Sequence, residues 1–478
     1  MKKFILYFIF IFSNFYLAAQ NNLTQGYDIQ LTAKGAVSGF AKLGYYYGEN
    51  AFLVDSAKVD STTFTARFVG NKKLEEGMYF VLLPNQEPID LVFDADMRFS
   101  IFTDVKELID SLKIQGSTEN EAYILYQKKL NRYKKQSAQS EYSMSLLQRA
   151  TRDPEAFKPI RDNMNQERKI LDVFTESFYK NYPKLLCTKY LKAAASPKIP
   201  ENIKPIFNTN SPNPVYYKYA REHLWDNFDF ADNRMLRSKI VTNKLTLHLQ
   251  QLTFQQIDSI QNSIDWIVKK ASVNTKMKAY ILMTMSNRFD NNYAPGADRV
   301  LVHIIDKYFP NEKDTTLTDI ATLTRLRYKA DMNRPNLTGN VAKEMRLMRP
   351  DSSFLSLSSI ASKYTLLYFY SPLCTHCQSK TPGIYDVFSK YKDKGIVCYA
   401  VNTDQEFGYW KNYIAEKKLD WYNVIDLQKA ANTWEKDYVA FNLPVLYLLD
   451  ADKKILMKRI EPERLEMVMK AIFPDEKK

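Results

Sequence analysis

Hydrophobic and polar positions alternate along the first part of the chain. Residues 27–32 and 62–69 carry apolar or β-branched side chains at every second position. This is the period of a strand with one buried face. Turn-forming residues such as Gly70 and Asn71 separate these stretches. Short strands at such spacing predict an antiparallel β-sandwich over residues 26–105.

Residues 117–335 have a different pattern, in which Lys, Gln, Glu, Leu and Tyr dominate and glycine is rare. Apolar residues recur there three or four positions apart, as on one face of an α-helix. Ser117 precedes the first helical stretch and is a suitable N-cap residue. We therefore predict an all-α domain. Its expected helices span residues 119–137, 155–181, 185–195, 216–225, 243–252, 254–271, 274–287 and 297–308.

Strand and helix patterns alternate in the last part of the chain, residues 340–478. The run 365–369 is apolar, aromatic or β-branched, which predicts a buried strand. Helical spacing follows over residues 378–391. Such alternation indicates a mixed sheet covered by helices. The predicted fold class is therefore multidomain, with a β-sandwich, an all-α domain and an α/β domain in that order.

The N-terminus begins with Lys2 and Lys3, continues with an apolar run over residues 4–12, and ends in small residues at Ala18 and Ala19. This order is typical of a secretory signal peptide, and we predict cleavage after residue 19. The apolar run is short for a membrane span, and no later stretch approaches the required length. We expect a protein exported to the periplasm or cell envelope, without a stable membrane span.

The charge of the chain restricts its partners. Its formal net charge is +13 at pH 7, or +11 without Lys2 and Lys3. Because Lys and Arg are spread along the sequence, this charge indicates a basic, solvated surface. Export argues against nucleic acid as a partner. The chain contains only four cysteines, and two of them, Cys187 and Cys398, lie in apolar stretches and are predicted to be core residues.

Cys374 and Cys377 stand where the predicted strand 365–369 gives way to a helix. The thiolate is the reactive form of cysteine, and a helix N-terminus favours an anion. Cys374 is therefore the expected nucleophile, and Cys377 is close enough to form a disulfide with it. His376 and Lys380 are candidates for tuning the thiolate, since positive charge stabilises it. The alternatives are a structural disulfide or half of a zinc site. Because zinc needs four ligands and no second Cys-x-x-Cys is present, no metal or other cofactor is expected.

With this motif the last domain resembles the thioredoxin superfamily, specifically the exported TlpA/ResA-like branch. Pro382 stands where that family kinks its active-site helix, and residues 395–404 match its second core strand. Residues 442–450 match the strand whose proline is cis and faces the dithiol. The resemblance implies a thioredoxin-like fold, a redox-active disulfide, and substrate binding at Leu443 and Pro444. Protein thiols and disulfides of the cell envelope would be its partners.

Two positions depart from the family pattern. Thioredoxins carry an acidic residue six positions before the first cysteine, where this chain has Tyr368. The ResA-like branch often has Glu three positions after the second cysteine, where this chain has Lys380. The acidic proton acceptor expected near the dithiol is therefore missing at both positions. The β-domain and the helical domain resemble domains that accompany exported thioredoxin-like proteins, the helical one being of unknown function.

Together these features predict an exported thiol–disulfide oxidoreductase that acts through a mixed-disulfide intermediate. Cys374 would attack, Cys377 would resolve, and the other domains would position partners or restrict access. The helical domain is a candidate for binding a protein partner. One alternative is a non-catalytic scaffold with a thioredoxin-like domain. Another is a thiol peroxidase, although Ser371 and Leu367 stand where peroxiredoxins have Thr and Pro before their cysteine.

Overall fold

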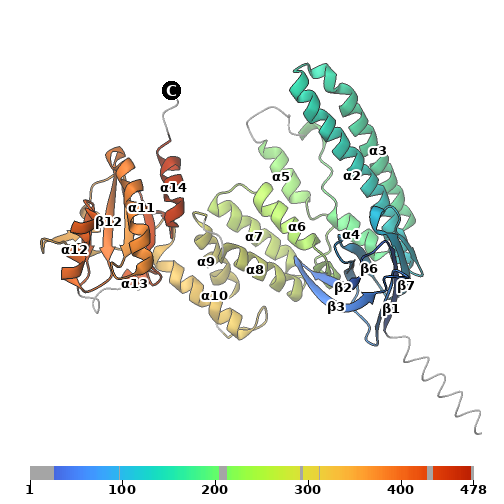
Figure 1. Ribbon diagram of the computed structural model, residues 1–478, viewed down its shortest axis with the longest axis horizontal. Helices are drawn as coiled ribbons and strands as arrows, with labels where there is room; N and C mark the ends of the chain where they lie inside the picture. The colour runs from blue at the N-terminus through green and yellow to red at the C-terminus, as the bar shows by residue number, and fades with distance from the viewer. Residues whose placement is uncertain are drawn as a thin grey trace, which may run out of the picture. The chain divides into compact units, whose positions relative to one another are not determined.

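The computed structural model describes residues 26–95, 97–203, 213–290, 294–311, 313–427 and 434–474. The predicted signal peptide lies outside these residues. The chain divides into two compact units, the first ending at Thr253 and the second beginning at Phe254 (Figure 1). This boundary falls inside the predicted all-α domain, so its helices are shared between the two units.

The first unit begins with two four-stranded sheets within the described residues, ordered β4-β1-β7-β8 and β3-β2-β5-β6. Buried side chains of both sheets, such as Ile29 and Leu43, belong to one hydrophobic core. The predicted β-sandwich is confirmed, although β1 and β7 pair in parallel. The strands are β1 (Tyr27–Lys34), β2 (Gly39–Tyr47), β3 (Asn50–Val59), β4 (Thr65–Gly70), β5 (Gly77–Leu82), β6 (Ile89–Phe93), β7 (Arg98–Asp104) and β8 (Lys113–Gln115).

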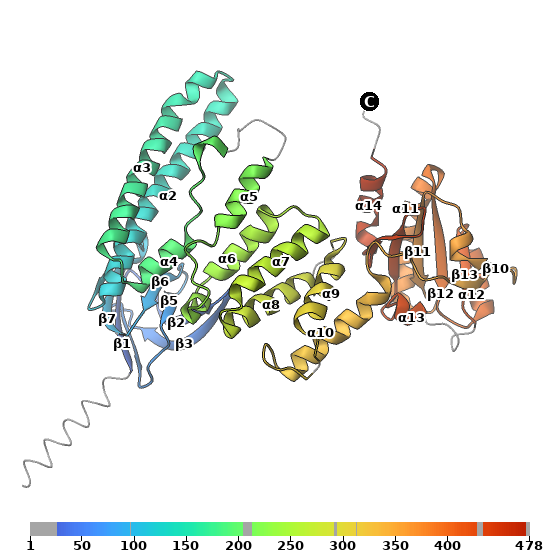
Figure 2. The same cartoon turned by 180° about the vertical axis from the view of Figure 1, so that it is seen from behind.

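Helices follow the sandwich in the first unit, and the longest of them, α2 and α3, lie side by side as a hairpin (Figure 2). Ser117 caps α2 as predicted, since its side chain accepts a hydrogen bond from the backbone N–H of Asn120. The Asn120 amide in turn donates to the Val92 carbonyl and accepts from the Val92 N–H, both at 2.8 Å. Helix α2 is thereby joined to strand β6. The helices are α2 (Thr118–Ala150), α3 (Lys158–Asn181), α4 (Leu186–Ala194), α5 (Pro214–His223) and α6 (Ile240–Thr246).

The second unit begins with α7 (Ile257–Ala271), α8 (Thr275–Asp290), α9 (Ala297–Tyr308) and α10 (Ile320–Asn333). Helix α10 was absent from the expected set. A seven-stranded mixed sheet follows in the described part of this unit, ordered β10-β9-β13-β12-β11-β14-β15. Its strands are β9 (Arg346–Met348), β10 (Phe354–Ser356), β11 (Tyr364–Tyr370), β12 (Ile396–Asn402), β13 (Tyr422–Ile425), β14 (Val445–Leu449) and β15 (Ile455–Lys458).

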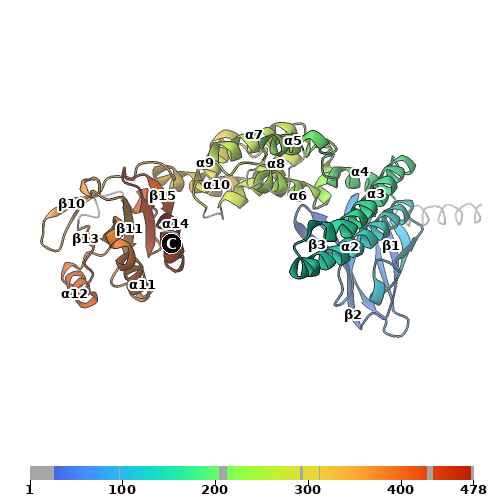
Figure 3. The ribbon, with the colours of Figure 1, turned by 90° about the horizontal axis from the view of Figure 1, so that it is seen from above.

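Strand β11 is central to this sheet, parallel to β12 on one side and antiparallel to β14 on the other. Successive side chains point to opposite faces, so Tyr368 joins one core and Phe369 the other. The first core is covered by α11 (Thr375–Tyr391), α12 (Phe407–Lys417) and α14 (Leu465–Ile472), which lie on one side of the sheet in Figure 3. Helix α13 (Trp434–Asp437) packs on the other face. The predicted α/β domain is confirmed.

Two further predictions concern the cysteines outside the motif and the absence of a membrane span. Cys187 in α4 and Cys398 in β12 are both buried and unpaired by disulfides, as expected for core residues. Among the residues that the structure describes, no helix combines the length and the apolar character that a membrane crossing requires.

Candidate functional site

The cysteine pair lies at the junction of a buried strand and a helix. All residues of β11 after the first are buried, and α11 begins one residue after Cys374. Cys374 is the N-cap of α11, and its sulfur accepts a hydrogen bond from the backbone N–H of Cys377 at 3.4 Å. The predicted position of the dithiol at a helix N-terminus is therefore confirmed. A helix N-terminus is a position where unpaired N–H groups favour an anion.

The two sulfurs lie in different environments. Cys374 is half-buried, whereas Cys377 is fully buried. Burial raises the pKa of Cys377 to about 12, although the Ser371 backbone N–H acts in the opposite direction. At neutral pH the accessible Cys374 can react as a nucleophile while Cys377 remains a thiol. This asymmetry is what a two-step exchange between an attacking and a resolving cysteine requires.

An acidic group does lie at this junction, at a position that the sequence analysis did not single out. Ser371 donates its hydroxyl hydrogen to Asp404 Oδ2 at 2.5 Å. The same Ser371 oxygen accepts the backbone N–H groups of Leu373 and Cys374, both at 3.1 Å. Asp404 follows β12, whose carboxyl end lies beside that of β11 because the two strands are parallel. A polar residue after each of two adjacent parallel strands was the signal that could have identified this pair.

The position that holds an acid in thioredoxins is occupied by the buried Tyr368. Thr381 donates its hydroxyl hydrogen to the Cys377 carbonyl, and Tyr368 Oη lies 2.7 Å from the same Thr381 oxygen. Tyr368 is therefore the donor to Thr381. Burial raises the pKa of Tyr368 far above its usual value. Tyr368 thus fills this position with a neutral, hydrogen-bonded phenol.

The two predicted tuning residues point elsewhere. Lys380 forms an ion pair with Glu463, and His376 is exposed. In the described part of the chain neither side chain hydrogen-bonds a cysteine sulfur. Because Glu463 offsets the charge of Lys380, the effect of Lys380 on the thiolate is reduced. The tuning roles of His376 and Lys380 stay predictions.

The Leu443–Pro444 peptide bond is cis, as the resemblance implied. These residues immediately precede β14, whose first residue Val445 pairs with Phe369 near the end of β11. Leu443 and Pro444 therefore lie at the same edge of the sheet as the cysteines. Leu443 packs against the hydrophobic cores on both faces. Their role in substrate binding remains a prediction.

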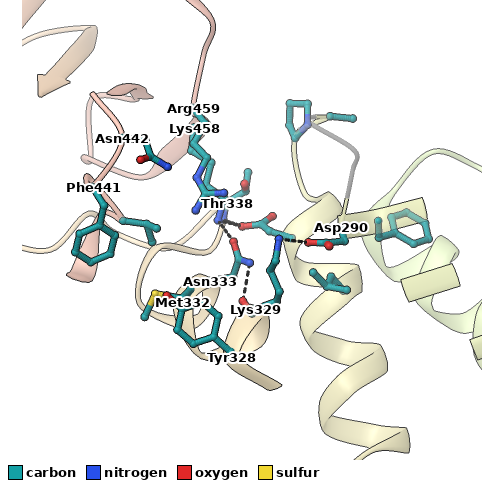
Figure 4. A pocket seen from close by; sticks show the side chains of 16 residues that line it. Asp290, Tyr328, Lys329, Met332, Asn333, Thr338, Phe441, Asn442, Lys458 and Arg459 are labelled. Atoms are coloured by element: carbon teal, nitrogen blue, oxygen red, sulfur yellow. Dashed lines mark hydrogen bonds and ion pairs between the residues drawn. The ribbon is translucent and has the colours of Figure 1, made fainter. Parts of the chain in front are cut away.

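A pocket of about 360 Å³ adjoins this segment through Phe441 and Asn442 (Figure 4). Its other walls come from α8, α9, α10 and the end of β15. Lys458 forms an ion pair with Asp298 at 2.6 Å. The neighbouring Arg459 is exposed and has no hydrogen-bonded or ionic partner among the described residues. The pocket thus combines aromatic side chains with an exposed cationic side chain.

The positions of the possible ligand side chains bear on metal binding. In the ranges that the structure describes, no group of three or more His, Cys, Asp or Glu side chains is arranged to hold a metal ion.

Comparison with known proteins adds to this geometry. A family model described as "Thioredoxin-like" matches residues 362–455. The C-terminal domain belongs to the thioredoxin-like family. A second model, "Domain of unknown function (DUF5106)", matches residues 160–334, within the predicted helical domain.

Relatives of the thioredoxin-like domain include two proteins named thiol-disulfide oxidoreductase ResA. The one from Bacillus anthracis is 29% identical over 124 residues, which cover 25% of this chain and 69% of the relative. The one from Bacillus thuringiensis subsp. konkukian is 27% identical over 123 residues, with the same coverage. Through this domain the chain is related to an enzyme family of thiol–disulfide oxidoreductases.

Solved structures similar to the chain include a domain of a possible thiol-disulfide isomerase from Cytophaga hutchinsonii. It is 34% identical and the match covers 30% of this chain and 96% of that domain, with a TM-score of 0.28. A thioredoxin-like protein from Bacteroides caccae is 18% identical over 58% of this chain and 98% of that protein, with a TM-score of 0.44.

Proposed function

We propose that the chain is an exported thiol–disulfide oxidoreductase whose redox-active pair is Cys374 and Cys377. The observation that carries this proposal is the contrast between the two sulfurs. Cys374 is accessible and caps a helix, whereas Cys377 is buried one turn along the same helix. The apolar N-terminal pattern over residues 4–12, preceded by lysines, supports export.

The reaction has two exchange steps. The Cys374 thiolate attacks a partner disulfide, forms a mixed disulfide and releases one partner thiolate. Cys377 then attacks Cys374 Sγ, so that the Cys374–Cys377 bond forms and the bond to the partner breaks. The partner disulfide is reduced to two thiols and the dithiol is oxidised. Run in reverse, the same steps oxidise a partner dithiol.

Proteins with accessible cysteines are the proposed partners. Leu443 and Pro444 would contact the partner backbone beside the dithiol, as the resemblance implies. The pocket next to them gives the helical region a route to the same partner, because α8, α9 and α10 supply its walls. Two exposed apolar side chains would add apolar contact with the partner. They are Leu373, which directly precedes Cys374, and Phe441, which lies two residues before Leu443.

The first test is trapping. Replacement of Cys377 by Ser should leave partner proteins attached to Cys374 as mixed disulfides, visible on non-reducing gels and lost on reduction. The Cys374→Ser variant should trap none. Cys187→Ser is the matched control, because Cys187 lies in α4 of the first unit and outside the hydrophobic core that contains Cys377, and it should behave like the wild type.

The second test is a redox titration of the pair by thiol alkylation across buffers of known potential. A reduction potential of about −270 mV would indicate a reductase, and a reduction potential of about −120 mV would indicate an oxidant of protein thiols. In the oxidant case His376 and Lys380 would be the first residues to replace. A pair that never cycles, together with full function of Cys374→Ser in a deletion strain, would instead assign a scaffold. Peroxide consumption that depends on Cys374 would assign a thiol peroxidase.

A further inference from the structure

The pocket beside the cis-proline segment lies within the second unit and has walls of two origins (Figure 4). One wall belongs to the α/β domain and is formed by the segment before β14 and the end of β15. The other comes from α8, α9 and α10, which belong to the helical region that matches the domain of unknown function. Its volume of about 360 Å³ is at the lower end of the range of ligand pockets in proteins. The ligand is therefore small, or it is one short segment of a larger partner.

The strand order places this pocket close to a partner that is bonded to the dithiol. Strand β14 lies between β11, which leads to Cys374, and β15, which ends at Lys458. The Ile460 N–H donates to the Leu446 carbonyl at 3.1 Å, so Arg459 lies beside the first residues of β14. Two strand spacings are about 10 Å, and an extended chain covers this distance in about three residues. A partner held at Cys374 can therefore reach the pocket with a residue close in sequence to its own cysteine.

The charges of the described side chains in the pocket favour an anionic ligand. Asp290 is paired with Lys329 at 3.1 Å, and Asp298 is paired with Lys458 at 2.6 Å. Arg459 is exposed and has neither a hydrogen-bond partner nor an ion-pair partner among the described residues. Because the two acids are already offset, a cationic ligand gains little there, whereas a carboxylate would meet Arg459. A guanidinium group can hold a carboxylate by two parallel hydrogen bonds.

Two further features are typical of a binding site. Arg459 and Val439 both line the pocket, and both have a left-handed backbone, with φ of 53° and 50°. This conformation is uncommon for residues other than glycine, above all for a β-branched one, and such strain concentrates at functional sites. The aromatic side chains of Tyr328 in α10 and of Phe441 are 59% and 52% exposed. The ligand should therefore carry an apolar group in addition to its acidic group.

We propose that this pocket binds an acidic segment of the partner protein, close in sequence to the cysteine that Cys374 attacks. A Glu or Asp side chain of this segment pairs with Arg459, and a neighbouring apolar side chain packs against Tyr328 and Phe441. This inference rests on the proposed oxidoreductase activity and adds a substrate preference to it. It also gives the helical region a function, because α10 supplies Tyr328 to a surface that selects partners.

The experiment uses the full-length reduced protein and short synthetic peptides that each contain one cysteine. This cysteine carries a thiopyridyl group, so the attack of Cys374 on the peptide sulfur forms the mixed disulfide and releases pyridine thione, which is measured by its absorbance. The peptides carry Glu or Gln about three to six residues before or after the cysteine, with Leu beside it. At the best position the second-order rate constant should be about fivefold larger for Glu, the upper value for an exposed ion pair. High salt should reduce this preference.

Variants of the full-length protein test the assigned contacts. Arg459→Gln should reduce the preference for Glu to less than about twofold, and Arg459→Glu should instead favour a peptide with Lys at that position. Arg346→Gln is the matched control, because Arg346 is an exposed arginine of β9, three strands away from β11 in the sheet order. It should keep the full preference for Glu. Tyr328→Ala should slow the reaction of peptides with Leu beside the acidic residue more than that of peptides with Ser there.

The outcomes separate this inference from the proposed function. Equal rates for the Glu and Gln peptides at every position would overturn the acidic preference. A preference that persists in Arg459→Gln would overturn its assignment to the pocket. If Arg459→Gln does not fold, Arg459→Gly takes its place with the same expected loss, because a φ of 53° suits glycine. If the wild type releases no thione from any peptide, the proposed oxidoreductase activity fails rather than this inference.

Discussion

The buried ion pair between Lys458 and Asp298 yields a prediction whose size can be worked out. Lys458 Nζ lies 2.6 Å from Asp298 Oδ2, and the two side chains are 11% and 7% exposed. Nζ also donates to the Oδ1 atoms of Asn333 and Asn336, at 3.0 and 2.8 Å. Burial lowers the pKa of Lys458 despite the nearby carboxylate. Desolvation therefore outweighs the attraction, and the pair is not a net source of stability.

Replacing Lys458 by Met leaves Asp298 buried, and among the described residues its remaining hydrogen-bond donor is the Thr338 N–H at 2.9 Å. Removing one partner of a buried pair costs about 3–5 kcal/mol. Protonation of the carboxyl limits this cost, because neutralising a group of ordinary pKa of about 4 at pH 7 requires about 4 kcal/mol. We expect Lys458→Met to lose about 4 kcal/mol of unfolding free energy at pH 7 and about 1.5 kcal/mol at pH 5. The loss grows with pH because the folded variant then holds a proton that its unfolded chain releases.

The assay is urea unfolding of the full-length protein at both pH values, with hydrogen exchange of β14 and β15 to assign the transition to the second unit. Lys454→Met, at an exposed lysine just before β15, should change the free energy by less than about 0.5 kcal/mol. Adding Asp298→Asn to Lys458→Met should recover most of the loss, since no uncompensated charge remains. A pH-independent loss, or no recovery in the double variant, would refute this account of the pair.

Three further predictions concern other parts of the molecule. Burial lowers the pKa of His248 to about 3, below its ordinary value of 6.5, so the unfolded chain alone binds a proton between these values. The free energy of unfolding should therefore fall by up to about 1.4 kcal/mol per unit as pH drops from 6.5 toward 3, and His248→Gln should flatten this slope in urea titrations. Iodoacetamide near neutral pH should alkylate Cys374 at least about tenfold faster than Cys377; peptide mapping that found the reverse order would contradict the assigned roles. Asn120→Ala should cost about 3 kcal/mol, because both backbone groups of the buried Val92 lose their partner, and unchanged hydrogen exchange in β6 would argue against it.

Features that depend on neighbouring residues could be predicted from the sequence. The alternating pattern of residues 62–69 predicted a strand, and β4 begins at Thr65 within this stretch and ends one residue beyond it. Ser117 was recognised as a cap, and Cys374 was expected at the N-terminus of the helix that it does cap. Each of these depends on the spacing of apolar and polar side chains within a short window, which the backbone geometry converts directly into a helix or a strand.

Element ends and one whole helix were less predictable. Helix α2 continues to Ala150, well beyond the expected end at residue 137. Its later turns carry a weak apolar pattern and lie against α3 (Figure 2). Tertiary packing, more than local propensity, supplies most of the stability of a helix in a protein. The sequence therefore indicated the helix but not its length.

The charges and hydrogen bonds of the site were decided by the tertiary structure. Ser371 and Asp404 are 33 residues apart in the chain and meet because β11 and β12 lie side by side in parallel. Lys380 forms an ion pair with Glu463, 83 residues away. This ion pair reduces the positive charge near the dithiol that the position of Lys380 in the sequence had implied. The sequence by itself thus determined the nature of the domains and the location of the dithiol. Which acid lies near that dithiol depends on contacts between distant segments, and a local pattern carries no information about such contacts.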